Sequence, residues 1–128
     1  YIHSWLMIEV MAVSKETSKN ALEKHIKKME NDKKCIVVKK SFGEVKKIKA
    51  PFKNIREAYS TIVEVEILTK NFDELIYIVL NYGPSAIEIL SPEEIKIKIS
   101  EAQGIVNTLA SLIHKFAAIH GGGIVVST

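Results

Sequence analysis

Residues 60–90 carry the sequence STIVEVEILTKNFDELIYIVLNYGPSAIEIL. Its apolar residues first alternate with polar ones, then recur at helical spacing, and then alternate again. Alternation predicts a strand, and the 3.6-residue period predicts a helix. Asn71 followed three residues later by Glu74 is typical of a helix start, and Gly83-Pro84 is typical of a helix end. This stretch therefore predicts a strand, a helix and a second strand.

The first forty residues show the same order of elements. An alternating segment runs from Tyr1 to Val13, and a helical stripe follows the capping residue Ser14. A short β-branched run then spans residues 35–40. Together the two halves predict a β-α-β-β-α-β order, which is the split β-α-β arrangement of the ferredoxin-like superfold. The predicted class is α+β, with strand order 4-1-3-2 and both crossover helices on one face.

Beyond this core the sequence predicts an extension. Isoleucines alternate with lysines over residues 95–99, which suggests an added edge strand. Ser100 and Gln103 form a capping pair, and an apolar stripe from Ile105 to Phe116 predicts a long amphipathic helix whose stripe is buried. A last edge strand is expected at residues 124–126. We expect one domain over residues 1–128, with its core at about 1–90 and a strand-helix-strand extension at about 91–128.

The composition indicates a globular chain without a membrane span. It has 128 residues, of which 47% are hydrophobic and 26% charged, and its longest uncharged stretch is far shorter than a bilayer requires. The start lacks the basic and small-residue pattern of a signal peptide, and Cys35 has no second cysteine to pair with. We therefore expect a cytoplasmic protein. Abundant lysine and isoleucine beside a single arginine fit either a thermophile or an AT-rich genome.

Face assignment leaves one side of the predicted sheet without a helix. This open face mixes large apolar and acidic side chains: Trp5, Met7, Glu9, Met11, Ile62, Glu64, Glu66, Leu68 and Glu88. So much apolar surface is more than a monomer normally exposes, so we expect a second subunit to cover it, giving a dimer or higher homo-oligomer. The third helix and a small ligand are the alternative covers.

Four carboxylates on that face raise the question of a metal. Glu9, Glu64, Glu66 and Glu88 would suit a hard cation such as Mg²⁺, or acid-base chemistry. We favour a solvated or lysine-paired strip, because no histidine or aspartate stands at a diagnostic spacing. We accordingly predict no metal, no cofactor and no catalytic residue.

A basic segment supplies the second candidate surface. Its cations are Lys39, Lys40, Lys46, Lys47, Lys49, Lys53 and Arg56, against the single acid Glu44. With Phe42 and Phe52 nearby, such a hairpin would suit nucleic acid or phosphate. Lysines also protect edge strands from aggregation, and we prefer that explanation.

A local resemblance comes from residues 73–83, DELIYIVLNYG, and residues 87–95, IEILSPEEI. This helix, glycine turn, strand and Ser-Pro-Glu step resemble the end of the C-terminal ferredoxin-like extension in WYL-domain transcription regulators. The chain lacks the helix-turn-helix and WYL core of that family. The resemblance implies an effector-sensing or oligomerising module and transfers no functional residue.

These observations predict an oligomeric ligand-sensing or interaction module rather than an enzyme. A small RNA-binding protein that uses the 39–56 hairpin is the first alternative. A metal-dependent enzyme that uses the carboxylates of the open face is the second.

Overall fold

A computed structural model of the chain describes residues 1–49 and 57–119. The chain divides into two compact units, Tyr1–Ile95 and Lys96–Thr128. The first unit is α+β, with an antiparallel sheet of five strands and two helices among its described residues. The second unit contains the helix α3 (Ile99–Ile119).

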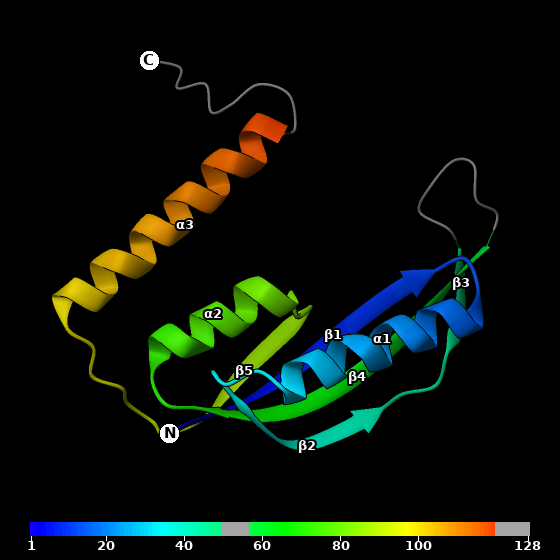
Figure 1. The fold of residues 1–128 in the computed structure, drawn as a ribbon, viewed down its shortest axis with the longest axis horizontal. Coiled ribbons are helices and arrows are strands. Elements are labelled where there is room, and N and C mark those ends of the chain that lie inside the picture. The colour runs from blue at the N-terminus through cyan, green and yellow to red at the C-terminus, as the bar shows by residue number, and fades with distance from the viewer. Residues whose placement is uncertain (50–56, 120–128) are drawn as a thin grey trace. The chain divides into compact units, whose positions relative to one another are not determined.

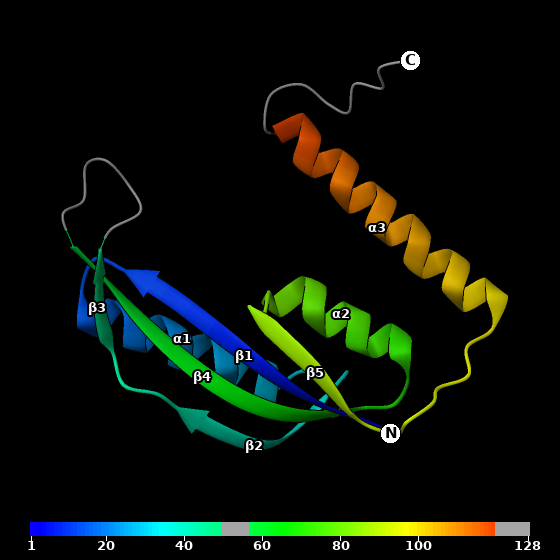
Figure 2. The ribbon, with the colours of Figure 1, turned by 180° about the vertical axis from the view of Figure 1, so that it is seen from behind.

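The sheet has the order β2-β4-β1-β5, and the short strand β3 pairs with β4 as well. Helices α1 and α2 lie on the same face of this sheet, as the two opposite views show (Figure 1, Figure 2). The first unit thus forms a layer of two helices on a layer of strands. The strands are β1 (Ile2–Ala12), β2 (Ile36–Phe42), β3 (Lys46–Lys49), β4 (Glu57–Thr69) and β5 (Ala86–Ser91).

The register of the strands divides the side chains between the two faces. Leu6 of β1 lies opposite Val65 of β4 and Ile87 of β5. Leu6 and Val65 are buried beneath the helices, as the alternation predicts. Ile87 and its neighbour Ile89 are on the same face but remain 41% and 44% exposed. Alternation along β5 predicts that both isoleucines pack under the helices, and this prediction is wrong because neither helix makes substantial contact with β5.

Helix α1 (Lys15–Glu30) begins where the sequence predicts. Ser14 caps it by accepting a hydrogen bond from the backbone N–H of Thr17 at 3.1 Å. Ser18 is a buried polar residue on the apolar side of the helix, and its hydroxyl lies 2.6 Å from that of Thr61 on β4. The remaining buried residues of the stripe are Leu22, Ile26 and Met29.

Helix α2 (Phe72–Tyr82) has the two predicted caps. The Asn71 side chain accepts a hydrogen bond from the Glu74 N–H at 2.8 Å, and the Glu74 carboxylate accepts one from the Lys70 N–H at 3.0 Å. Gly83 ends the helix in the left-handed region with φ +57°, and its N–H donates to the carbonyl of Val79.

The two helices of the first unit end at one corner. The Tyr82 hydroxyl at the end of α2 donates to Asp32, just after α1, at 2.7 Å. The Nε2 atom of His25 lies 2.9 Å from the Tyr82 carbonyl oxygen, and the two rings meet edge to face. His25 thus connects α1 to the end of α2 through its contacts with Tyr82.

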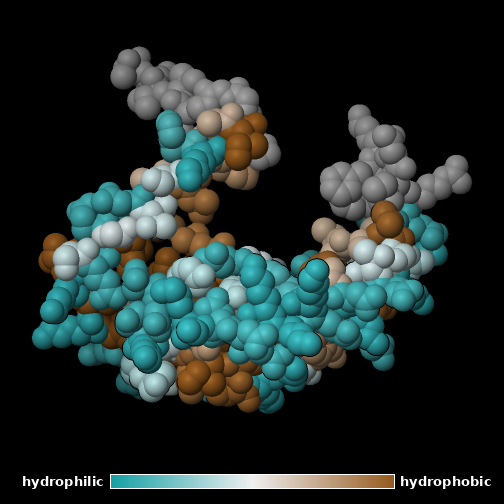
Figure 3. Space-filling model, in the orientation of Figure 1, coloured by the Kyte–Doolittle hydropathy of each residue, from teal (hydrophilic) through white to brown (hydrophobic). Residues whose placement is uncertain are grey.

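The extension differs from the prediction. Residues 95–98 form no strand, and the last strand predicted at residues 124–126 lies outside the described residues. Of the apolar stripe on α3, Ile105 is buried, but Leu109 is 41% and Phe116 63% exposed. The hydrophobic side chains along α3 are visible in Figure 3. Among the described helices, none has the length and apolar character that a bilayer crossing needs.

Candidate functional site

The open face combines residues from β1, β4 and β5. Trp5 of β1 lies opposite Glu66 of β4 and Glu88 of β5, and Met7 lies opposite Glu64. Glu9 lies opposite Ile62, and Met11 follows on the same side. The structure thus gathers the nine predicted residues on the face away from α1 and α2: Trp5, Met7, Glu9, Met11, Ile62, Glu64, Glu66, Leu68 and Glu88.

A small hollow lies beside the indole of Trp5. The indole Nε1 donates a hydrogen bond to Glu64 Oε1 at 3.2 Å, which fixes the ring across the two central strands. The hollow has a volume of about 180 Å³, and Lys39 and Ser41 of β2 complete its wall together with Glu66. It offers an aromatic surface with charged groups of both signs around it.

Each carboxylate of the central strands has a partner within the chain. Glu66 Oε1 lies 2.8 Å from His3 Nε2, and Glu66 Oε2 lies 3.8 Å from Lys39 Nζ. Glu9 accepts a hydrogen bond from the Ser60 hydroxyl. These contacts favour the paired strip over a metal site, and the described residues contain no group of three or more ligating side chains placed for a metal.

The apolar side chains of the open face are only partly exposed to solvent. Trp5, Met7 and Ile62 are half-buried. Met11 is 51% exposed and Ile36 of β2 is 52% exposed. The face thus keeps contact surface available to a partner, although less than the sequence alone suggested.

Three residues of the open face or its margin are absent from the sequence prediction. His3, Ile36 and Ser60 all lie on the open face or at its margin. The alternation of β1 could have revealed His3, because it shares its parity with Trp5 and Met7. The position of Ile36 on this face depends on the register of β2 with β4, which no local sequence pattern shows.

The basic hairpin is partly neutralised within the chain. Lys40 Nζ lies 2.8 Å from Glu30 Oε1, Lys47 Nζ lies 2.8 Å from Glu57 Oε1, and Lys39 contacts Glu66. Ion pairs of this kind reduce the positive field that a phosphate backbone would meet. Lys46 and Lys49 lie on β3, whereas Lys53 and Arg56 lie outside the described residues.

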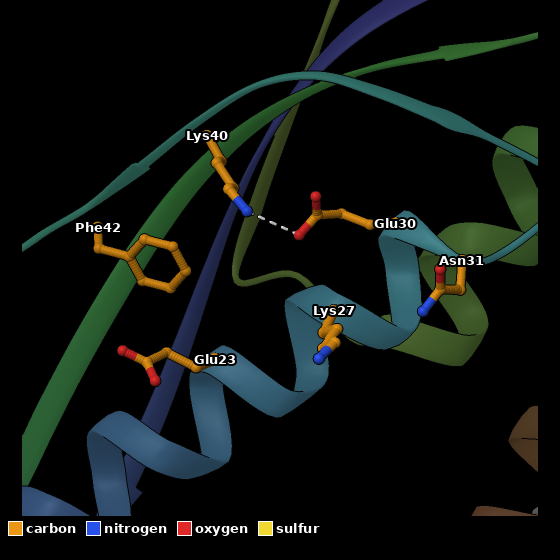
Figure 4. A pocket seen from close by; sticks show the side chains of 6 residues that line it. All are labelled: Glu23, Lys27, Glu30, Asn31, Lys40 and Phe42. Atoms are coloured by element: carbon orange, nitrogen blue, oxygen red, sulfur yellow. Dashed lines mark hydrogen bonds and ion pairs between the residues drawn. The ribbon is translucent and has the colours of Figure 1, made fainter.

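A second hollow lies between α1 and β2, on the helix side of the sheet (Figure 4). It measures about 530 Å³, and the ion pair between Lys40 and Glu30 crosses it. Phe42 and Glu23 lie to the left of this ion pair in the same view, and Lys27 and Asn31 complete the lining. Both signs of charge are balanced here, so this hollow has no evident preference for an anionic or a cationic ligand.

The buried ionisable groups lie away from both hollows. Burial raises the pKa of the Cys35 thiol to about 11, and the nearby Asp32 and Glu74 carboxylates add to the shift. Burial also raises the pKa of Tyr82, with a further contribution from its hydrogen bond to Asp32. A thiol with a raised pKa is a poor nucleophile, which supports an inert Cys35.

The comparison with protein families covers nearly the whole chain. The family model that matches spans residues 3–128 and describes the MJ0538 family. The chain belongs to the MJ0538 family. Because the match extends across both compact units, the family pattern includes α3 as well as the sheet. No curated protein matches the chain. The resemblance of residues 73–95 to WYL-domain regulators stays a prediction.

Proposed function

We propose that this member of the MJ0538 family is a non-catalytic interaction module of the ferredoxin-like superfold that self-associates through its open face. The strand order supports the superfold: with the short β3 set aside, β5-β1-β4-β2 corresponds to 4-1-3-2. Both helices lie on the other face, so the first unit itself leaves the open face uncovered.

The observation that carries the proposal is that carboxylates of the open face make hydrogen bonds and ion pairs within the chain. An unpaired acidic row would repel the same row of a second copy. Here Glu64 is bonded to Trp5, Glu66 contacts His3 and Lys39, and Glu9 is bonded to Ser60. These contacts give the carboxylates partners in their own chain. Exposed apolar groups such as Met11 are left to contact a second copy. A twofold interface of this kind needs only one self-complementary patch.

Substitution of Met11 tests the proposal. Met11→Lys places a cation at an exposed apolar position of the open face, so we expect a lower average mass in sedimentation equilibrium than for the wild type. Leu80→Lys is the matched control, because Leu80 is an exposed apolar residue on α2 and not on the open face. An equal mass for the wild type and Met11→Lys would contradict the proposal.

A further inference from the structure

The two edges of the sheet have different chemistry. The β2 edge has a register shift between Val37 and Lys39, and it carries two lysines, both features that block pairing with another strand. The β5 edge carries a single charged residue, Glu88, and three half-exposed apolar residues, Ile87, Ile89 and Leu90. Its outer side pairs with no described strand. The β5 edge is therefore the unprotected edge of the sheet.

The chain also contains a strand-like segment without a described partner strand. Residues 95–98 read Ile-Lys-Ile-Lys, with apolar residues on one side and cations on the other. They lie outside any helix or strand, and Ile95 and Ile97 are 39% and 38% exposed. Alternation of apolar and charged residues over this segment is the pattern of a half-buried strand.

The β5 edge and this segment are complementary on both faces. In β5 the side chains of Ile87 and Ile89 share the face of Leu6, and Glu88 shares the face of Trp5. An antiparallel alignment with Lys96 opposite Glu88 also sets Ile97 opposite Ile87 and Ile95 opposite Ile89. One register therefore pairs opposite charges on one face and covers the exposed isoleucines on the other.

We propose that the β5 edge binds residues 95–98 of a second copy of this chain as an added antiparallel strand, and that the exchange is reciprocal. The chain leaves β5 at Ser91, and its own residues 92–98 form no strand with β5. Exchange of an identical element between copies is a low-cost route to a dimer. This inference shares Glu88 with the open face, but it concerns the edge of the sheet and does not require a second copy to cover that face.

Crosslinking of two separately made single-cysteine proteins tests the exchange. Glu88→Cys and Lys96→Cys are each made with Cys35→Ala, mixed and oxidised. Opposed residues of an antiparallel pair lie within disulfide range, so we expect a covalent heterodimer. Lys39→Cys mixed with Lys96→Cys is the control, because Lys39 lies on the other edge, and it should give no specific product.

A protein with both cysteines separates the remaining outcomes. A disulfide closed within a monomer, together with no crosslink in the mixture, would show that the segment pairs with its own β5 and would overturn the exchange. Absence of a disulfide in both experiments would overturn the pairing itself. Neither result changes the expected effect of Met11→Lys on mass, so failure of the exchange and failure of the open-face contact are distinguishable.

Charge reversal provides a second test. Glu88→Lys or Lys96→Glu alone should raise the dimer dissociation constant roughly tenfold, since the reciprocal exchange sets two like-charge pairs in each dimer. The double variant restores opposite charges and should return the dissociation constant close to the wild-type value. Additive weakening in the double variant would overturn the proposed register.

Discussion

Trp5 and Glu64 are 59 residues apart in the sequence, yet the indole Nε1 of Trp5 donates a hydrogen bond to Glu64 Oε1 at 3.2 Å in the middle of the open face. Trp5 is the only tryptophan of the chain. Its fluorescence therefore reports on this face without interference from another indole.

The first prediction uses this reporter. If a second copy covers the open face, dilution should expose Trp5 to water and shift its emission maximum to longer wavelength. Met11→Lys should show the long-wavelength emission at every concentration, whereas Leu80→Lys should follow the wild-type curve. An emission maximum that is independent of protein concentration, with a wild-type mass above that of the monomer, would show that the contact lies elsewhere.

A pair of glycines provides the second prediction. Gly83→Ala should lower the free energy of unfolding by about 1 kcal/mol, because alanine resists the left-handed conformation at φ +57°. Gly104→Ala lies inside α3 and should raise helix stability by up to about 1 kcal/mol. A Cβ atom would meet nothing within 4 Å at either position, so backbone conformation alone distinguishes them. Urea titrations followed by circular dichroism measure both effects.

The third prediction concerns alkaline pH. The Cys35 thiol has a pKa of about 11 in the fold and an ordinary value of 9.0 in the unfolded chain. The unfolded chain therefore loses this proton first, so stability is fully present below pH 9 and falls as the pH rises toward 11. We expect a total loss of about 3 kcal/mol from this group once the pH exceeds 11, since one pKa unit corresponds to about 1.4 kcal/mol.

The control for this prediction is Cys35→Ala, compared by urea unfolding across the same pH range. Its free energy of unfolding should fall less than that of the wild type between pH 9 and 10. Above pH 10 a further decrease should remain in both proteins, because the pKa of Tyr82 is also raised by burial. Identical pH profiles for the two proteins would mean that Cys35 is not buried in solution.

The fourth prediction tests the alternative of RNA binding. We expect no submicromolar binding to RNA at about 150 mM salt, and reduced solubility when Lys46, Lys47 and Lys49 are replaced by Ala. Filter binding or fluorescence anisotropy measures the first, and precipitation by ammonium sulfate the second. Tight wild-type binding that the triple substitution abolishes would restore the nucleic-acid hypothesis.

Most of the core was predictable because its signals are local. The caps at Ser14, Asn71 and Gly83 act within one helical turn, and the alternation of β1 and β4 decides which side chains meet the helices. The gathering of Trp5 and Glu64 on the open face followed from the same alternation once the strand order was assumed. Local periodicity thus accounts for the sheet and for most of the candidate surface.

The errors arose where long-range contact decides the outcome. Ile87 has the pattern of a buried strand residue, but its burial depends on a covering helix, and neither helix makes substantial contact with β5. Residues 95–98 have the pattern of a strand, but a strand requires a partner, and the pattern does not say which chain supplies one. Leu109 belongs to a helical stripe whose periodicity fixes its side of α3 but not what covers that side.

The pairing of the strands determines when the sheet can fold during synthesis of the chain. Each strand pair in the described sheet includes β1 or β4, and β1 itself pairs only with strands that come later than residue 56. While a ribosome has produced only residues 1–56, the described sheet contains no strand pair that these residues could form by themselves. Folding of the sheet therefore waits for β4 to emerge, and a gene split between α1 and β4 would separate β1 from both of its partner strands.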